Sequence, residues 1–119
     1  MVMENETESS IPGLIEKIEF DSLLDAAKRV RANSDVVEFG CYLGRSTSAI
    51  LLGLREKEDV SMHVYDGFEI PEKDPFAKTL VSHSLSVDLQ HLIYKDKVGK
   101  LHWERVFDSL ITPFKKNSF

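Results

Sequence analysis

The spacing of apolar residues changes along the first third of the chain, and each spacing predicts a different element. In residues 21–32 the apolar positions share one helical stripe, with most basic residues lying off it. The stripe consists of Leu23, Leu24, Ala27 and Val30. Residues 35–39 (DVVEF) are instead short, β-branched and followed at once by a glycine. We therefore predict an amphipathic helix and then a buried parallel strand.

A second helix and a second strand follow in the pattern. Residues 46–57 place Ile50, Leu51 and Leu54 on one face and predict a helix with Ser46 or Thr47 as its N-cap. Residues 61–65 (SMHVY) alternate polar and apolar side chains and stop at an Asp-Gly turn. Strand, helix and strand together predict a right-handed βαβ unit.

The rest of the chain is less regular. Asp74 and Pro75 supply an N-cap and a first helical residue, and spaced leucines extend the predicted helix to Tyr94. After a loop, residues 100–104 (KLHWE) predict a third strand, and residues 107–119 are weakly patterned. The expected fold class is α/β, with about three parallel strands and flanking helices.

Composition limits the size of the protein and its partners. A chain of 119 residues is long enough for one domain. We expect a flexible leader over residues 1–12, rich in glutamate at its start, and a domain over residues 13–119. The net charge of −5 contains no block of like charges, which argues against a nucleic-acid partner and favours a small molecule.

Cysteine usage and hydropathy indicate the compartment. The single cysteine, Cys41, has no partner for an internal disulfide, and no Cys/His spacing suits zinc. The chain shows no signal peptide and no apolar run near the ~20 residues that span a bilayer. We therefore expect a cytoplasmic protein without a membrane anchor.

The strongest candidate site is the loop after the first strand. An acid, Glu38, ends the strand; Gly40 and Gly44 stand four apart; and Ser46 follows at a helix start. Gly40 lets the backbone turn and approach a ligand, and Gly44 permits close packing against a helix. The N–H groups at the helix start suit a carboxylate, to which Ser46 can add its hydroxyl, while Glu38 suits an ammonium group.

A second candidate residue lies at the end of the second strand. Asp66 follows Gly44 by twenty-two residues, where dinucleotide-type folds place an acid that accepts ribose hydroxyls. The loop that contains Gly40 and Gly44, here called the glycine loop, and this acid therefore predict the same kind of ligand. An ordinary turn aspartate before a glycine is the alternative reading of Asp66.

These residues carry a resemblance to a known family. VVEFGCYLGRSTSAILL, followed by VYDGFEIPE, resembles the macrocin O-methyltransferase-like group of class I S-adenosylmethionine-dependent methyltransferases over residues 35–72. The resemblance implies a partial Rossmann-like methyltransferase fold and O-methylation of a small-molecule or sugar hydroxyl. The implied S-adenosylmethionine contacts are Glu38, Gly40, Cys41, Tyr42, Gly44, Ser46 and Asp66.

The resemblance also shows which parts of such an enzyme this chain does not match. The family's sheet has seven strands, and its base and metal carboxylates lie beyond the third. The catalytic residues are therefore unknown, and no Mg²⁺ ligands are visible. We expect a domain truncated after the third strand, inactive by itself, whose first strand presents an open edge for self-association.

Two other functions remain open at this point. One is a non-catalytic S-adenosylmethionine-binding fragment or assembly partner. The other is a fragment of an NAD(P)-binding short-chain oxidoreductase, although no Tyr-x-x-x-Lys pair is present in the chain.

Several reactive side chains have plainer explanations than catalysis. Cys41 is expected to be a loop residue and not a nucleophile, and Trp103 to pack in the core. The four histidines are expected to be surface or core residues, and the acids at positions 69, 72 and 74 to form a solvated loop, with a lid over the cofactor as the alternative.

Overall fold

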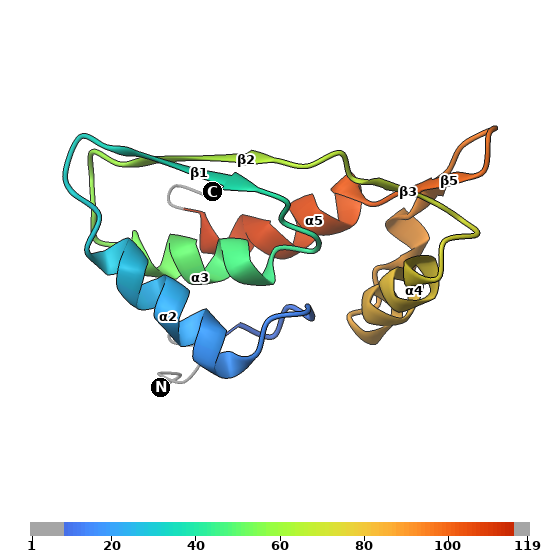
Figure 1. The fold of residues 1–119 in the computed structure, drawn as a ribbon, viewed down its shortest axis with the longest axis horizontal. Helices are drawn as coiled ribbons and strands as arrows, with labels where there is room; N and C mark the ends of the chain where they lie inside the picture. Colours follow the sequence, from blue (N-terminus) through green and yellow to red (C-terminus); the bar gives the residue numbers. More distant parts are fainter. Residues whose placement is uncertain (1–8, 116–119) are drawn as a thin grey trace.

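The computed structural model describes residues 9–115, which form a mixed α/β structure (Figure 1). Within this range lie four α-helices, a two-stranded parallel sheet and a three-stranded antiparallel sheet. The predicted α/β class is confirmed, but only two strands are parallel. Of the leader expected at residues 1–12, the structure describes residues 9–12, where Ser9 and Ile11 are buried.

The parallel sheet has the predicted bounds. It consists of β1 (Asp35–Phe39) and β2 (Ser61–Tyr65), which pair along their whole length. The helix α3 (Arg45–Gly53) connects them, so the predicted strand–helix–strand order is confirmed. Both strands end at the same edge, because Phe39 is the register partner of Tyr65.

Within residues 9–115, helices cover only one face of this sheet. Figure 1 shows α2 (Lys17–Lys28), α3 and α5 (Glu104–Ile111) below the sheet. Val37, Phe39 and Tyr65 are exposed, Phe39 to 79%. The rings of Phe39 and Tyr65 stack with their centroids 5.6 Å apart. Within residues 9–115 the second edge of β1 has no partner strand, and self-association through it stays a prediction.

The helix α2 begins and ends four residues before the predicted 21–32. Glu16 and Glu19 explain the early start, because each side chain accepts the other's backbone N–H in a capping box. Glutamate is not a usual N-cap residue, so this start was hard to predict from the residue pattern. α2 packs on α3 and encloses a small core of Phe20, Leu24, Ala49 and Leu52.

The helix α3 is shorter than the predicted 46–57, and its N-cap differs. Gly44 occupies the N-cap with a left-handed φ of 105°, so the expected cap at Ser46 or Thr47 is wrong. Those two hydroxyls instead donate to the carboxylate of Glu38. The helix ends at Gly53, where it lies closest to α2.

The predicted third parallel strand is wrong in direction and extent. β5 (Lys100–His102) pairs antiparallel with β3 (Glu69–Pro71) on one side and with β4 (Tyr94–Lys95) on the other. It is shorter than the predicted 100–104, since Trp103 is already the N-cap of α5. A hairpin turn at Gly99, with φ of 85°, fixes this direction.

The helix predicted to reach Tyr94 ends sooner, as α4 (Phe76–Ser86). Asp88 has a φ of 59°, which a continuing helix cannot contain. Its N–H bonds the carbonyl of Leu85, and the N–H of Leu89 bonds that of Ser84, which together make a Schellman cap. A short 3₁₀-helix (Gln90–Leu92) follows.

The larger core lies around α5. The helix α5, which begins before the stretch expected to be weakly patterned (107–119) and overlaps its start, buries Val106, Phe107 and Ile111. They pack with residues of the expected leader, the glycine loop, α4, β5 and the N-cap of α5, namely Ile11, Cys41, Leu43, Ala77, Leu80, Leu101 and Trp103. The glycine loop is therefore built into the core and does not stand free of it.

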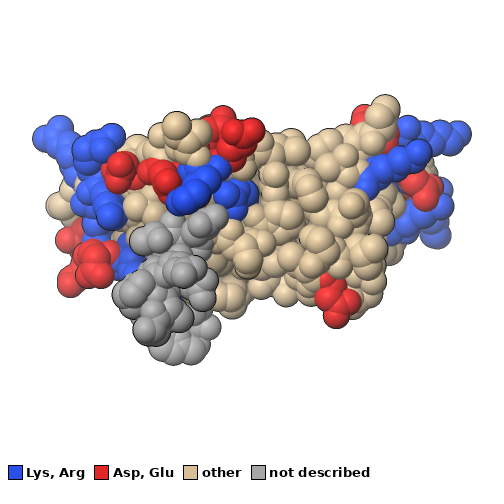
Figure 2. Space-filling view, turned by 90° about the horizontal axis from the view of Figure 1, so that it is seen from below, with Lys and Arg blue, Asp and Glu red and all other residues tan. Residues whose placement is uncertain are grey.

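Charge is spread without a dominant sign on the face shown in Figure 2. Basic and acidic side chains lie together toward the two ends of the molecule, with a broad uncharged area between them. In the described part of the chain no helix is both long and apolar enough to cross a bilayer.

Candidate functional site

The loop between β1 and α3 contains two glycines in different surroundings, Gly40 beside open space and Gly44 packed against α5. At Gly40 a Cβ atom would meet no heavy atom within 4 Å, and the φ of 83° is left-handed. At Gly44 a Cβ atom would stand 3.2 Å from the ring of Phe107 and 3.3 Å from Ile111. The expected close packing at Gly44 is therefore present, against α5, while Gly40 leaves open space beside the backbone.

Asp66 ties this loop to the end of β2. Its Oδ2 accepts the backbone N–H groups of Cys41, at 2.9 Å, and Tyr42, at 3.2 Å. Its Oδ1 accepts the N–H of Phe68 at 2.7 Å. A carboxylate oxygen has two lone pairs, so Oδ2 is fully engaged and Oδ1 has room for one more donor. Asp66 is thus a structural brace that keeps limited capacity for a ligand hydroxyl.

Glu38 lies on the covered face of β1, below the same loop. Its two carboxylate oxygens accept the hydroxyls of Ser46 and Thr47 from the first turn of α3. The structure therefore brings Glu38 and Ser46 together as predicted, but they bond each other. A ligand ammonium group would have to share or displace these hydroxyls.

Two hollows flank the loop. One, of about 170 Å³, is lined by Gly40, Cys41, Tyr42, Ser46, Arg45 and residues 13–15. The other, of about 580 Å³ and more open, is lined by residues 64–68 and Glu104. Ligand pockets are commonly about 300–1,000 Å³. The smaller hollow fits one end of a ligand, and the hydrogen bonds of Asp66 to Cys41 and Tyr42 join the linings of the two.

Three aromatic rings, those of Phe76, His83 and Trp103, pack against the partly buried ring of Tyr42. Its φ is 50°, and its hydroxyl lies 2.8 Å from Nδ1 of His83. Trp103 donates its indole N–H to the Tyr42 carbonyl at 3.1 Å. Burial raises the pKa of Tyr42 to about 12. A neutral, fixed tyrosine at this position shapes the loop and is a poor proton acceptor.

Cys41 is equally unsuited to nucleophilic chemistry. Its side chain is buried in the larger core. Burial raises the pKa of the Cys41 thiol, and the charges of Asp66 and Glu38 raise it further. A thiolate is the reactive form, so this cysteine is inert at neutral pH.

The acids of the predicted loop at positions 69, 72 and 74 have local partners. Glu69 pairs with Lys100 at 2.8 Å, and Glu72 with Lys95 at 2.9 Å. Asp74 accepts the N–H of Phe76 at the start of α4. None of them lines the two hollows beside the glycine loop. In the described residues no group of three or more His, Cys, Asp or Glu side chains could hold a metal ion.

Three residues near the loop were not singled out as site residues from the sequence. Arg45 and Glu104 line the two hollows, and His83 contacts Tyr42. Glu104 and His83 come from other elements, α5 and α4, whose approach to the loop depends on tertiary packing. Only Arg45, which lies between Gly44 and Ser46, could have been suspected from the motif.

Comparisons with protein-family models, with curated proteins and with solved structures found no match for this chain.

Proposed function

We propose that the chain binds S-adenosylmethionine at the β1–α3 loop and carries the cofactor-binding half of a Rossmann-like class I methyltransferase. The observation that supports this most is the convergence at one sheet edge. There a glycine with open space, the N-terminus of α3 and two carboxylates lie within one hydrogen-bonded unit. The methyl acceptor we propose is a hydroxyl group of a small molecule or sugar.

The residues present fit the chemistry of this ligand. The first-turn N–H groups of α3 have no intrahelical acceptors, and two first-turn residues, Arg45 and Ser46, line the smaller hollow, so a carboxylate is favoured at this end of the helix. Glu38 lies beside them for an ammonium group, and Oδ1 of Asp66 accepts one further hydroxyl. When bound, S-adenosylmethionine supplies an electrophilic methyl group. The chain's residues bind and orient it, which is the main requirement of methyl transfer.

Two alanine variants test the assignment. Gly40 and Gly99 have nearly the same φ, 83° and 85°, and neither Cβ would meet an atom within 4 Å. Each substitution is expected to cost about 1–2 kcal/mol of unfolding free energy through left-handed strain. Only Gly40→Ala is expected to weaken S-adenosylmethionine binding, by about tenfold or more, because only its methyl group would enter the ligand's space.

Isothermal titration of both variants and the parent with S-adenosylmethionine, S-adenosylhomocysteine and NAD measures this directly. Thermal unfolding of the same proteins shows whether Gly40→Ala and Gly99→Ala lower the unfolding free energy by similar amounts. Equal binding by the parent and Gly40→Ala would mean that the loop is only a turn. Tighter binding of NAD than of either methionine derivative would replace the proposed cofactor with a nicotinamide.

A further inference from the structure

The segment before α2 is tied across the start of α3 by one side chain. Arg45 donates from Nε to the carbonyl of Ile15 at 3.1 Å and from Nη1 to the carbonyls of Ser9, at 2.8 Å, and Ile11, at 3.4 Å. We call residues 9–15 the strap. Three carbonyls from seven residues thus converge on one guanidinium group.

The strap also packs against the core and against the side chain of Arg45. Ile11 is 2% exposed and packs in the larger core. The hydroxyl of Ser9 accepts the N–H of Ile11 at 3.0 Å. A Cβ atom on Gly13 would stand 3.0 Å from Cβ of Arg45, so the strap lies directly on this side chain.

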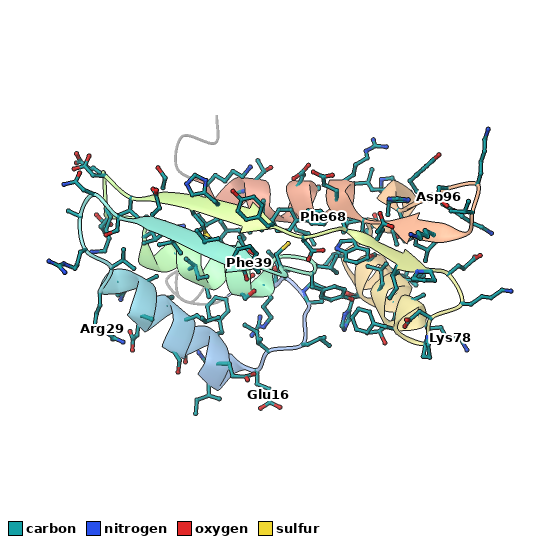
Figure 3. All side chains as sticks on the ribbon, turned by 45° about the horizontal axis from the view of Figure 1, so that its top comes forward. Glu16, Arg29, Phe39, Phe68, Lys78 and Asp96 are labelled. Atoms are coloured by element: carbon teal, nitrogen blue, oxygen red, sulfur yellow. The ribbon has the colours of Figure 1, made fainter. Side chains whose placement is uncertain are left out.

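The strap forms a wall of the smaller hollow beside the glycine loop. Gly13, Leu14 and Ile15 line it together with residues 40–42. Leu14 is 66% exposed, so the strap is a thin layer with solvent on its outer side. Figures 1 and 3 both show the start of the described chain rising from α2 toward the loop between β1 and α3.

Arg45 carries a charge that the strap does not neutralise. In residues 9–115 no carboxylate lies within ion-pair distance of it, and its guanidinium carbon is 5.0 Å from the ring centroid of Phe20. Carbonyl oxygens and a ring face stabilise a cation without cancelling its charge. Arg45 therefore adds one positive charge to the wall of a hollow whose other nearby charges, Asp66 behind Cys41 and Glu38 behind Ser46, are negative.

We propose that the strap is a gate over the carboxylate end of the bound ligand and that Arg45 is the positioning residue that latches it. This inference rests on the proposed binding of S-adenosylmethionine at the same loop. A ligand enters and leaves this end only when the strap lifts, so loosening the latch should speed exchange of the ligand and weaken its binding.

The matched variants are Arg45→Lys and Arg55→Lys. Lysine keeps the charge at position 45 but lacks the planar fork that reaches several carbonyls at once. Arg55 is exposed and lies beyond the C-terminal end of α3, whereas Arg45 begins that helix. Its variant therefore controls for replacing an arginine by a lysine on this part of the chain. Hydrogen exchange followed by mass spectrometry measures the strap and strands β1 and β2 in each protein, with and without S-adenosylhomocysteine.

We expect Arg45→Lys to speed exchange in residues 9–15 by about tenfold, because about one to two hydrogen bonds are lost, with β1 and β2 unchanged. S-Adenosylhomocysteine should slow strap exchange in the parent and dissociate about fivefold or more faster from Arg45→Lys by stopped flow. Arg55→Lys should behave like the parent.

The outcomes separate the two proposals. Two results would contradict the gate and leave the proposed binding site unaffected. One is that the parent binds S-adenosylhomocysteine while hydrogen exchange in its strap is the same with and without this ligand. The other is that Arg45→Lys releases the ligand at the parental rate. If the parent binds neither methionine derivative, the binding site and the gate fall together.

Discussion

Replacing Gly53 with alanine is expected to lower the free energy of unfolding by about 2–3 kcal/mol. On helix propensity alone the change would stabilise the chain by up to about 1 kcal/mol. The packing term opposes it, because the new Cβ atom would stand 2.4 Å from the carbonyl oxygen of Leu24 and 2.6 Å from Cβ of Ala27. Neither atom can rotate away, so α2 and α3 must move apart and open the core around Phe20.

Gly67→Ala is the control for this variant. Its Cβ atom would have no neighbour nearer than 4.0 Å, and its φ lies outside the left-handed region. We expect its unfolding free energy to stay within about 0.5 kcal/mol of the parent. Urea unfolding followed by circular dichroism compares the two. A Gly53→Ala protein as stable as the parent would show that the two helices do not approach so closely.

Asp66→Ala is expected to have the largest combined effect on stability and binding. It removes the acceptor of three backbone N–H groups, from Cys41, Tyr42 and Phe68. Because the site is half-buried and water replaces part of the loss, we expect a cost of about 2 kcal/mol in unfolding free energy. Binding of S-adenosylmethionine should fall by about tenfold or more in the protein that remains folded.

Two further variants show how much of this effect is specific. Asp66→Asn keeps one acceptor oxygen and should fall between the parent and Asp66→Ala. Asp74→Ala removes a carboxylate that accepts a single N–H, from Phe76, at an exposed position, and should cost about 1 kcal/mol or less with no change in binding. If Asp66→Ala matched Asp74→Ala in both measurements, Asp66 would be an ordinary turn residue.

The parallel strands and the loop were predictable because their signals are local. The β-branched run before Gly40 and the alternating run before Asp66 define β1 and β2 residue for residue. Once two strands are parallel, their carboxyl ends share an edge, so the proximity of the glycine loop and Asp66 followed from the sequence. That Asp66 would brace the loop by its N–H groups did not follow.

The pairing direction of β5, the end of α4 and the contact of Arg45 with residues 9–15 were not predictable from local sequence. Residues 100–102 have strand character, but nothing in three residues says which strand they pair with or in which direction. The end of α4 depends on Asp88 adopting a left-handed φ, which aspartate does only in some contexts. The hydrogen bonds of Arg45 to residues 9–15 join positions about thirty apart, and no repeating pattern of residues predicts such a contact.

The contact between Trp103 and the glycine loop gives this protein a built-in optical probe. Trp103 is the only tryptophan, is 6% exposed, and donates its indole N–H to the carbonyl of Tyr42, with the ring of Phe68 against it. Its emission is expected to be blue-shifted in the folded chain and to change in intensity when a ligand moves the loop. Titration by intrinsic fluorescence can therefore follow binding without any label, and an unchanged spectrum at a saturating ligand concentration would mean that the loop is preformed.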